Sequence, residues 1–279
     1  MAAYRRATPD EAVRLAAFCA KAYGEDASYF ERRWEHDPAS DSFSAVLEER
    51  GSVVAHLHVF ARSVFLRRDA APHCCACIGN VAVGRAHRGR RLSTQLLQEC
   101  LADCRASGFT LSLLHTHLPT VYERAGYRTL PVHEVALSGA SLVSWSEIEI
   151  DSRLQELYRR EHGGRPGTVA RDAAWWEARE RWLGAEGWRT MGVAGIDGYC
   201  CMRNTGDGGQ VDEAVGACGR LVRQSPPGSG SWRIRLPLSR REAAAGPEGA
   251  VRMGLALDPG ADLSPLASEG AVSWRTDEF

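Results

Sequence analysis

The chain has 279 residues, of which 44% are hydrophobic and 25% are charged, and its formal net charge is −1. This composition is typical of a globular protein of one large or two modest domains, and the balanced charge gives no global electrostatic basis for binding nucleic acid. Because we find neither a targeting signal at the N-terminus nor a run of roughly 18 apolar residues, we expect a cytoplasmic protein with no membrane partner.

Strand and helix patterns alternate through the first half of the chain. Thr8-Pro9 before two acids is typical of a helix start, and Gly51-Ser52 between two alternating apolar runs indicates a hairpin. The predicted strands are 4–6, 43–47, 53–65, 74–83, 109–114 and 127–137, and the predicted helices start at Thr8 and cover 28–34, 92–104 and 119–125. This order predicts a domain built on a mixed α/β sheet that ends near residue 140.

Patterns in the second half are weaker. They indicate helices over 154–162 and 172–182 and strands over 191–202, 210–217 and 232–238. The Ala/Gly-rich segment 242–250 is predicted to be mobile. Four tryptophans of this second half fit a core better than a binding groove: Trp175, Trp176, Trp182 and Trp188. We therefore expect two domains, residues 1–140 and 141–279.

The nine cysteines include a cluster, Cys74, Cys75 and Cys77, that follows His73. Neighbouring residues of a strand point to opposite faces, so this spacing is poor for zinc. An odd number of cysteines without an export signal argues against a disulfide framework. We expect free thiols and no metal site.

A loop of small and basic residues, Gly84 to Arg91, runs directly into the helix that starts at Leu92. The first turn of a helix offers unpaired N–H groups and the positive end of a dipole, which together suit a pyrophosphate. Four arginines in seven residues add positive charge. The loop is not a Walker loop, because GxxxxGK[ST] is absent; a basic loop of this kind can also be an ordinary solvated surface.

The segment VAVGRAHRGRRLS, residues 81–93, resembles motif A of the GCN5-related N-acetyltransferases (GNAT), and YERAGY, residues 122–127, resembles their motif B. This resemblance covers residues 1–140 and implies acetyl-CoA as the co-substrate. Arg91 and Ser93 depart from the family pattern, because glycine is usual at the first position and Gly or Ala at the second. The implied cofactor-binding residues are Val81, Ala82, Val83, Arg88, Gly89, Arg90, Arg91, Leu92, Ser93 and Thr94.

A narrower resemblance joins Thr116, Tyr122 and Tyr127 with RPGTVARDAAWW at 165–176 and Gly198-Tyr199. It is to the enhanced intracellular survival group of acetyltransferases. This likeness implies a GNAT fold with two tandem acyl-CoA N-acyltransferase-like domains, the second degenerate. Members of that group carry a third, sterol-carrier-like domain, for which this chain is too short, so we expect that domain to be absent.

The expected reaction is direct attack of an amine on the thioester. A backbone N–H near Val81 to Val83, freed where the strand splays, would stabilise the oxyanion. Tyr122 stands where the superfamily often places its general acid. Its ordinary pKa is near 10 against roughly 8.5 for a thiol, so proton transfer is uphill by only about 2 kcal/mol. The alternative is that Tyr122 only packs beneath the strand.

The general base stays open. The usual glutamate is missing, and its region reads Ile78-Gly79-Asn80. The narrower resemblance implies a C-terminal phenylalanine carboxylate, here Phe279, although in that group this terminus belongs to the third domain. His115 and His117 are rival bases by side-chain chemistry.

We expect an acetyltransferase that acts on the primary amine of a small molecule. The alternatives are a catalytically weak or inactive CoA-binding or ligand-binding protein of the same fold, made plausible by Arg91, Ser93 and the missing glutamate, and a protein-directed acetyltransferase. The oligomeric state, including a homo-oligomer, is left open.

Overall fold

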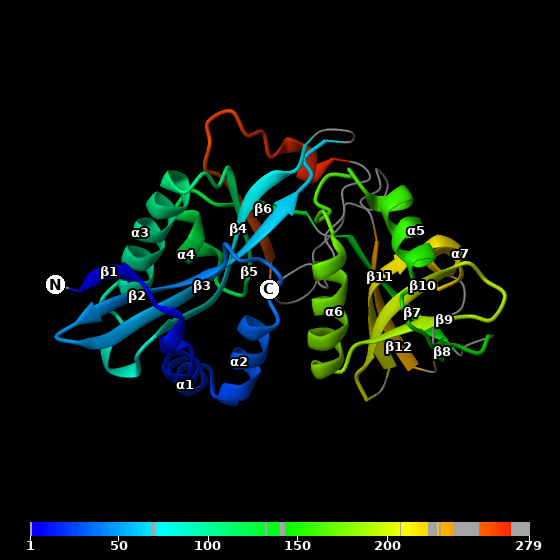
Figure 1. The fold of residues 1–279 in the computed structure, drawn as a ribbon, viewed down its shortest axis with the longest axis horizontal. Coiled ribbons are helices and arrows are strands. Elements are labelled where there is room, and N and C mark those ends of the chain that lie inside the picture. The colour runs from blue at the N-terminus through cyan, green and yellow to red at the C-terminus, as the bar shows by residue number, and fades with distance from the viewer. Residues whose placement is uncertain are drawn as a thin grey trace.

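The computed structural model describes residues 2–67, 71–131, 133–139, 143–206, 208–222, 228, 230–236 and 251–268. Two mixed sheets lie side by side (Figure 1). The first has the order β1-β2-β3-β4-β5-β13-β6, from strands Ala3–Arg6, Phe43–Glu49, Ser52–Val64, His73–Val83, Leu111–Thr116, Val251–Ala256 and Arg128–Leu130. The second has the order β7-β12-β11-β10-β9-β8, from strands His133–Gly139, Gly230–Leu236, Gly208–Val215, Gly198–Asn204, Arg189–Gly192 and Ser146–Glu147.

Helices cover both faces of the first sheet. These are α1 (Ala12–Tyr23), α2 (Ala27–Glu35), α3 (Leu92–Ala106) and α4 (Pro119–Glu123). Helix α3 buries its predicted leucine stripe against Leu57 and Val59 of β3, whereas α1 and α2 pack with Ala82 on the opposite face. Helix α3 also makes the crossover that joins β4 to its parallel neighbour β5.

The predicted elements of this half lie within a few residues of the observed ones. The β2–β3 hairpin turns at Arg50-Gly51 rather than at Gly51-Ser52, and both turn residues have positive φ (52° and 77°), as a two-residue hairpin loop of type I′ requires. The Thr8 amide donates to the Glu11 carboxylate at 3.0 Å, which fixes the start of the 3-10 turn Pro9–Glu11 before α1.

The two sheets exchange strands across residue 140. Strand β7 precedes that point but pairs with β12 of the second sheet, and β13 follows it but lies between β5 and β6 of the first. Strand β13 had not been predicted. The division into domains 1–140 and 141–279 stays a prediction, with the qualification that hydrogen-bonded pairing does not stop at the boundary.

The second half adds α5 (Ser152–His162), α6 (Ala173–Ala185), α7 (Gly216–Leu221) and a 3-10 turn, Ser264–Ala267. Trp175, Trp176 and Trp188 are buried in it, as expected of core residues. The predicted mobile segment 242–250 lies outside the described residues. None of the described helices is long and apolar enough to cross a membrane.

One apolar core joins the two halves. Phe60 of β3 and Leu113 of β5 pack in the same cluster as Leu157 of α5 and Tyr199 of β10. Backbone hydrogen bonds between Phe65 and the loop at 167–168, at 2.8 and 2.9 Å, add to this contact. The face of β4 and β5 opposite α3 is therefore covered by the second half.

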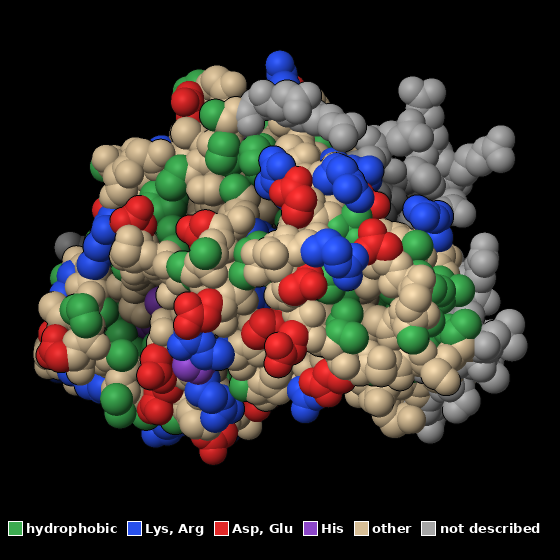
Figure 2. Space-filling view, turned by 45° about the vertical axis from the view of Figure 1, so that its right-hand side comes forward, with side chains coloured by type: hydrophobic (Ala, Val, Ile, Leu, Met, Phe, Trp, Pro, Cys, Tyr) green, Lys and Arg blue, Asp and Glu red, His purple; other side chains and the backbone are tan. Residues whose placement is uncertain are grey.

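Charges and thiols follow the expected pattern. Acidic and basic side chains are interspersed on the face in Figure 2. All nine cysteines are free, and only Cys74 is exposed. Cys74 and Cys75 face opposite sides of β4, which agrees with the argument made from their spacing.

Candidate active site

Strands β4 and β5 separate halfway along β4. They pair in parallel only from Cys75–Leu111 to Ile78–Leu114. On its other edge β4 stays paired with β3 as far as Val83. The edge of β4 that faces β5 is therefore open beyond Ile78. The proposed oxyanion donor in Val81 to Val83 lies on this splayed segment and stays a prediction.

A β-bulge marks the start of the splay. His56 and His58 of β3 pair with Ala82 and Gly79, so that Asn80 and Val81 together oppose one residue of β3. Asn80 has a φ of 50°, in the left-handed region that asparagine tolerates better than most residues. The Trp34 indole N–H donates to Asn80 Oδ1 at 3.1 Å, and the Tyr23 hydroxyl donates to the Val81 carbonyl at 2.8 Å.

The predicted phosphate loop has the backbone that a cradle at a helix N-terminus requires. Gly89 and Arg91 both have positive φ, 79° and 58°, and Arg91 is the N-cap of α3. The left-handed conformation that favours glycine is thus kept although arginine occupies the position. Leu92 is buried and anchors the helix, while Ser93 and Thr94 are half-buried in its first turn.

The arginines of this loop differ in their partners. Arg90 makes two hydrogen bonds to the Glu49 carboxylate, at 2.9 and 3.0 Å, and these bonds hold the pKa of Glu49 below its usual value. Arg88 donates to the Ala22 carbonyl at 3.2 Å. Arg85 and Arg91 are exposed and have no ion-pair partner among the described residues. A phosphate contact of Arg90, predicted from the motif, would therefore compete with Glu49.

Tyr122 lies on α4, half-buried against the core beneath α3. Its ring meets that of Tyr127 edge to face, with centroids 6.0 Å apart. Burial raises the pKa of Tyr122, and a hydrogen bond with Thr116 offsets part of that rise. The phenol is therefore protonated at neutral pH, as a general acid must be. The ring also packs against the core, as the alternative of a packing role requires.

The candidate bases occupy different places. His115 is half-buried on β5 and pairs in register with Arg252 of β13. Residues alternate along β5, so His115 shares the face of Leu113 and lies across the sheet from the core that holds Tyr122. His117 is exposed. Phe279 lies outside the described residues, and its role stays a prediction.

The motif residues of the second half meet in one buried cluster. The Arg171 guanidinium is bonded to Glu213 at 2.6 and 3.0 Å and lies 3.8 Å from the Tyr158 ring centroid and 4.2 Å from that of Trp175. Burial raises the pKa of Glu213, but Arg171 and Arg179 outweigh that effect and hold the pKa below its ordinary value. The Tyr199 hydroxyl also donates to this carboxylate.

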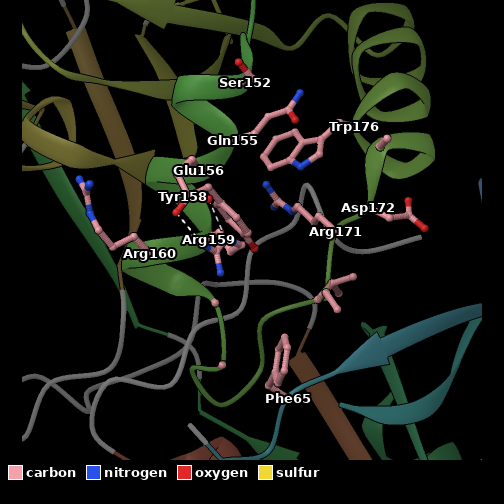
Figure 3. A pocket seen from close by; sticks show the side chains of 15 residues that line it. Phe65, Ser152, Gln155, Glu156, Tyr158, Arg159, Arg160, Arg171, Asp172 and Trp176 are labelled. Atoms are coloured by element: carbon pink, nitrogen blue, oxygen red, sulfur yellow. Dashed lines mark hydrogen bonds and ion pairs between the residues drawn. The ribbon is translucent and has the colours of Figure 1, made fainter. Parts of the chain in front are cut away.

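This cluster closes the floor of a cavity of about 630 Å³ between α5 and α6. Figure 3 shows Arg171 pointing toward the Trp176 ring, with Gln155 above and Phe65 of the first half below. The Arg171–Glu213 pair joins the loop before α6 to β11, and the stacking of Arg171 on Tyr158 and Trp175 adds contacts with α5 and α6.

Comparison with known proteins gives one family match, over residues 3–130, to the acetyltransferase (GNAT) domain. No curated protein matches the chain. Among solved structures, a GCN5-related N-acetyltransferase from Kribbella flavida is 17% identical, with a TM-score of 0.67 over 92% of this chain and 72% of the other. Eis1 from Mycobacterium abscessus is 16% identical, with a TM-score of 0.65 over 95% and 76%. A tandem GNAT protein from the clavulanic acid biosynthesis pathway is 12% identical, with a TM-score of 0.54 over 94% and 100%. At these identities the structures show a shared fold.

Proposed function

We propose that the chain, whose residues 3–130 match the acetyltransferase (GNAT) domain, transfers the acetyl group of acetyl-CoA to the primary amine of a small molecule by direct attack. The expected mixed α/β fold with two tandem acyl-CoA N-acyltransferase-like units is confirmed. The observation that carries the proposal is the open edge of β4 beyond Ile78, where Val81 and Val83 pack in the same core as Leu92 of α3 and Tyr122 of α4.

Phosphate binding is assigned to the loop before α3. The first-turn N–H groups of Leu92, Ser93 and Thr94 lie at the positive end of a helix of 15 residues. Arg88 and Arg91 are exposed beside them and would supply charge. Val81 to Val83 offer backbone groups along the splayed edge that would bind the rest of acetyl-CoA.

The chemical step divides between the two faces of the sheet. As the amine nitrogen bonds to the acetyl carbon and the C–S bond breaks, a backbone N–H of the splayed segment stabilises the oxyanion and Tyr122 protonates the departing sulfur. A base on the opposite face takes the proton that the ammonium loses. His115 is on that face, and the Phe279 carboxylate is the alternative.

A small acceptor is favoured because the second half covers the face that carries His115. Leu113, its neighbour on that face, is buried in the core shared by both halves. Access from this face is therefore restricted, which suits a free polyamine or an aminoglycoside-like molecule better than a side chain on a folded protein.

The test is a thiol-release assay with acetyl-CoA over a panel of small primary amines, with thermal denaturation in parallel. We expect turnover with at least one amine and stabilisation by CoA. Stabilisation by CoA without turnover on any amine or peptide would support the inactive ligand-binding alternative. Turnover on lysine-containing proteins alone would identify a protein-directed enzyme.

A further inference from the structure

A buried chain of polar groups ends at the bulge of β4. The His58 Nδ1 lies 2.9 Å from Ser44 Oγ, the same oxygen lies 3.1 Å from His56 Nε2, and His56 Nδ1 lies 3.2 Å from the Asn80 carbonyl oxygen. His56 is 0% exposed and His58 is 6% exposed. No step of the mechanism above uses either histidine.

Two further side chains hold the same segment. Trp34 of α2 donates to the side chain of Asn80, and Tyr23 at the end of α1 donates to the carbonyl of Val81. Trp34 also stacks on His58, with centroids 5.2 Å apart and planes 9° apart. The bulge is thus bonded to α1, α2 and β3 at the point where its pairing with β5 has ended.

The hydrogen bonds of this buried polar chain are compatible with either neutral tautomer of His56. In the first, His56 carries its proton on Nδ1 and donates to the Asn80 carbonyl, while Ser44 donates to His56 Nε2 and accepts from His58 Nδ1. In the second, His56 carries its proton on Nε2 and donates to Ser44. The Cys19 thiol, 3.1 Å from His56 Nδ1, then becomes the donor to that nitrogen, and the Asn80 carbonyl loses its bond.

Burial decides the charge of both rings. It lowers the pKa of His56 to about 4, although the hydrogen bond to Asn80 offsets part of the effect, and it holds the pKa of His58 well below its ordinary value. Both rings are neutral near pH 7. The position of the His56 proton, rather than a charge, therefore determines whether His56 bonds to the Asn80 carbonyl.

We propose that Tyr23, Trp34 and His56 are positioning residues that hold the splayed segment Asn80–Val81 in the shape that receives acetyl-CoA, with His56 acting as its Nδ1–H tautomer. This inference rests on the proposed function. Asn80 has a left-handed backbone that is not self-sustaining, because few non-glycine residues adopt it without help from their surroundings. Three hydrogen bonds from three elements supply that help.

The main experiment removes one hydrogen-bond donor at a time. Tyr23→Phe and Trp34→Phe delete one donor each while keeping an aromatic ring, and Tyr23 is half-exposed, so its variant retains the fold. We expect each to weaken acetyl-CoA binding about three- to tenfold by calorimetry, with the unfolding temperature of Tyr23→Phe unchanged. Tyr29→Phe, which loses a hydroxyl that accepts from Arg33, is the matched control and should bind as wild type does.

A second pair of variants tests the tautomer. Cys19→Ser places a stronger donor beside His56 Nδ1 and should favour the Nε2–H tautomer, with weaker binding of acetyl-CoA. Cys19→Ala removes the rival donor, together with the 3.9 Å bond from the Cys19 thiol to the Asn80 carbonyl, and should keep His56 as the Nδ1–H tautomer. Imidazole ¹⁵N chemical shifts report the tautomer directly. A role in packing alone would make both variants less stable and leave the His56 tautomer unchanged.

The outcomes separate the two proposals. A wild-type chain that neither binds CoA nor acetylates any amine overturns the proposed function. A wild type that binds and turns over, with Tyr23→Phe and Trp34→Phe indistinguishable from it or tighter in binding, overturns the positioning role alone. A His56 found as the Nε2–H tautomer in the wild type overturns its part in that role.

Discussion

Arg90 of the phosphate loop and Glu49 of β2 form a two-bonded ion pair at 2.9 and 3.0 Å, beside the cradle that the arginine was expected to serve. Glu49 is the last residue of β2, before the turn at Arg50-Gly51, so this hairpin ends against the loop. A cofactor phosphate and the Glu49 carboxylate would compete for the same guanidinium. The pair therefore reduces the positive charge available to a pyrophosphate.

Glu49→Gln should release Arg90 for phosphate. We expect the KM for acetyl-CoA to fall about two- to fivefold at low ionic strength and the gain to shrink as salt screens the exposed charges. Steady-state kinetics at two salt concentrations measure the effect, with Glu48→Gln as a control, since Glu48 pairs with Arg5 instead. A KM that is unchanged or higher in Glu49→Gln would mean that Arg90 does not contact the phosphates.

Tyr122→Phe tests the general acid. Loss of the proton donor should lower kcat about a hundredfold or more, with little change in the affinity for acetyl-CoA. Tyr127→Phe is the matched control. Its hydroxyl is buried and bonded to Ser112 at 2.6 Å, so that variant should lose about 1 kcal/mol of stability and keep its kcat. Wild-type turnover in Tyr122→Phe would reduce the residue to a packing role.

The general base is assigned by two changes made separately. Adding two residues after Phe279 moves the terminal carboxylate, and His115→Gln removes the imidazole while keeping a polar side chain. We expect one of the two to lower kcat about a hundredfold and the other to leave it near wild type. Circular dichroism checks that both variants fold. Retained turnover in both would assign the proton to His117 or to a water relay.

Local patterns predicted the first half well because its signals are local. The leucine stripe of α3 and the turn before β3 depend on residues close in sequence; the helix starts where it was expected, and the turn lies one residue earlier. Strand β13 gave no such signal. Val251–Ala256 is a short apolar run whose partners, β5 and β6, lie in the other half of the chain, so only tertiary structure shows that it is a central strand.

The site was predictable to the same extent. The motif around Arg88 to Ser93 predicts where the cradle lies, because its residues are contiguous. The bond between Arg90 and Glu49 could not be read from the sequence, since it requires the register of a distant hairpin. His56 and His58 were visible only as two residues of an alternating strand, and nothing local separates a buried polar chain from ordinary strand residues.

Stability should depend on pH through the buried histidines. The pKa of His56 and that of His162 are each lowered by burial to about 4, from 6.5 in the unfolded chain. The unfolded chain therefore takes up protons first as pH falls. Stability is complete above about pH 6.5 and declines toward pH 4, by up to about 3 kcal/mol for each residue.

Urea titrations from pH 7.5 to 4 measure this decline, and His56→Asn should reduce its slope. The stability that Glu11 contributes is lost in a lower pH range than that of the histidines. Its hydrogen bonds with Arg5 lower its pKa from 4.5 to about 2, so its contribution is lost only below pH 4.5. A stability that is constant between pH 6.5 and 5 would contradict the burial of neutral imidazoles in the folded chain.

Gly254 tests whether β13 is a central strand of the first sheet. It is buried between β5 and β6, and a Cβ added there would meet Leu130 at 2.9 Å and Leu113 at 3.2 Å. Gly254→Ala should therefore destabilise the chain by about 1–3 kcal/mol, because both leucines must shift. Gly184→Ala is the control. That residue is exposed in α6 with open space around it, and alanine should raise stability by about 0.5 kcal/mol. Equal stability of the two variants in urea would mean that β13 is not held between β5 and β6.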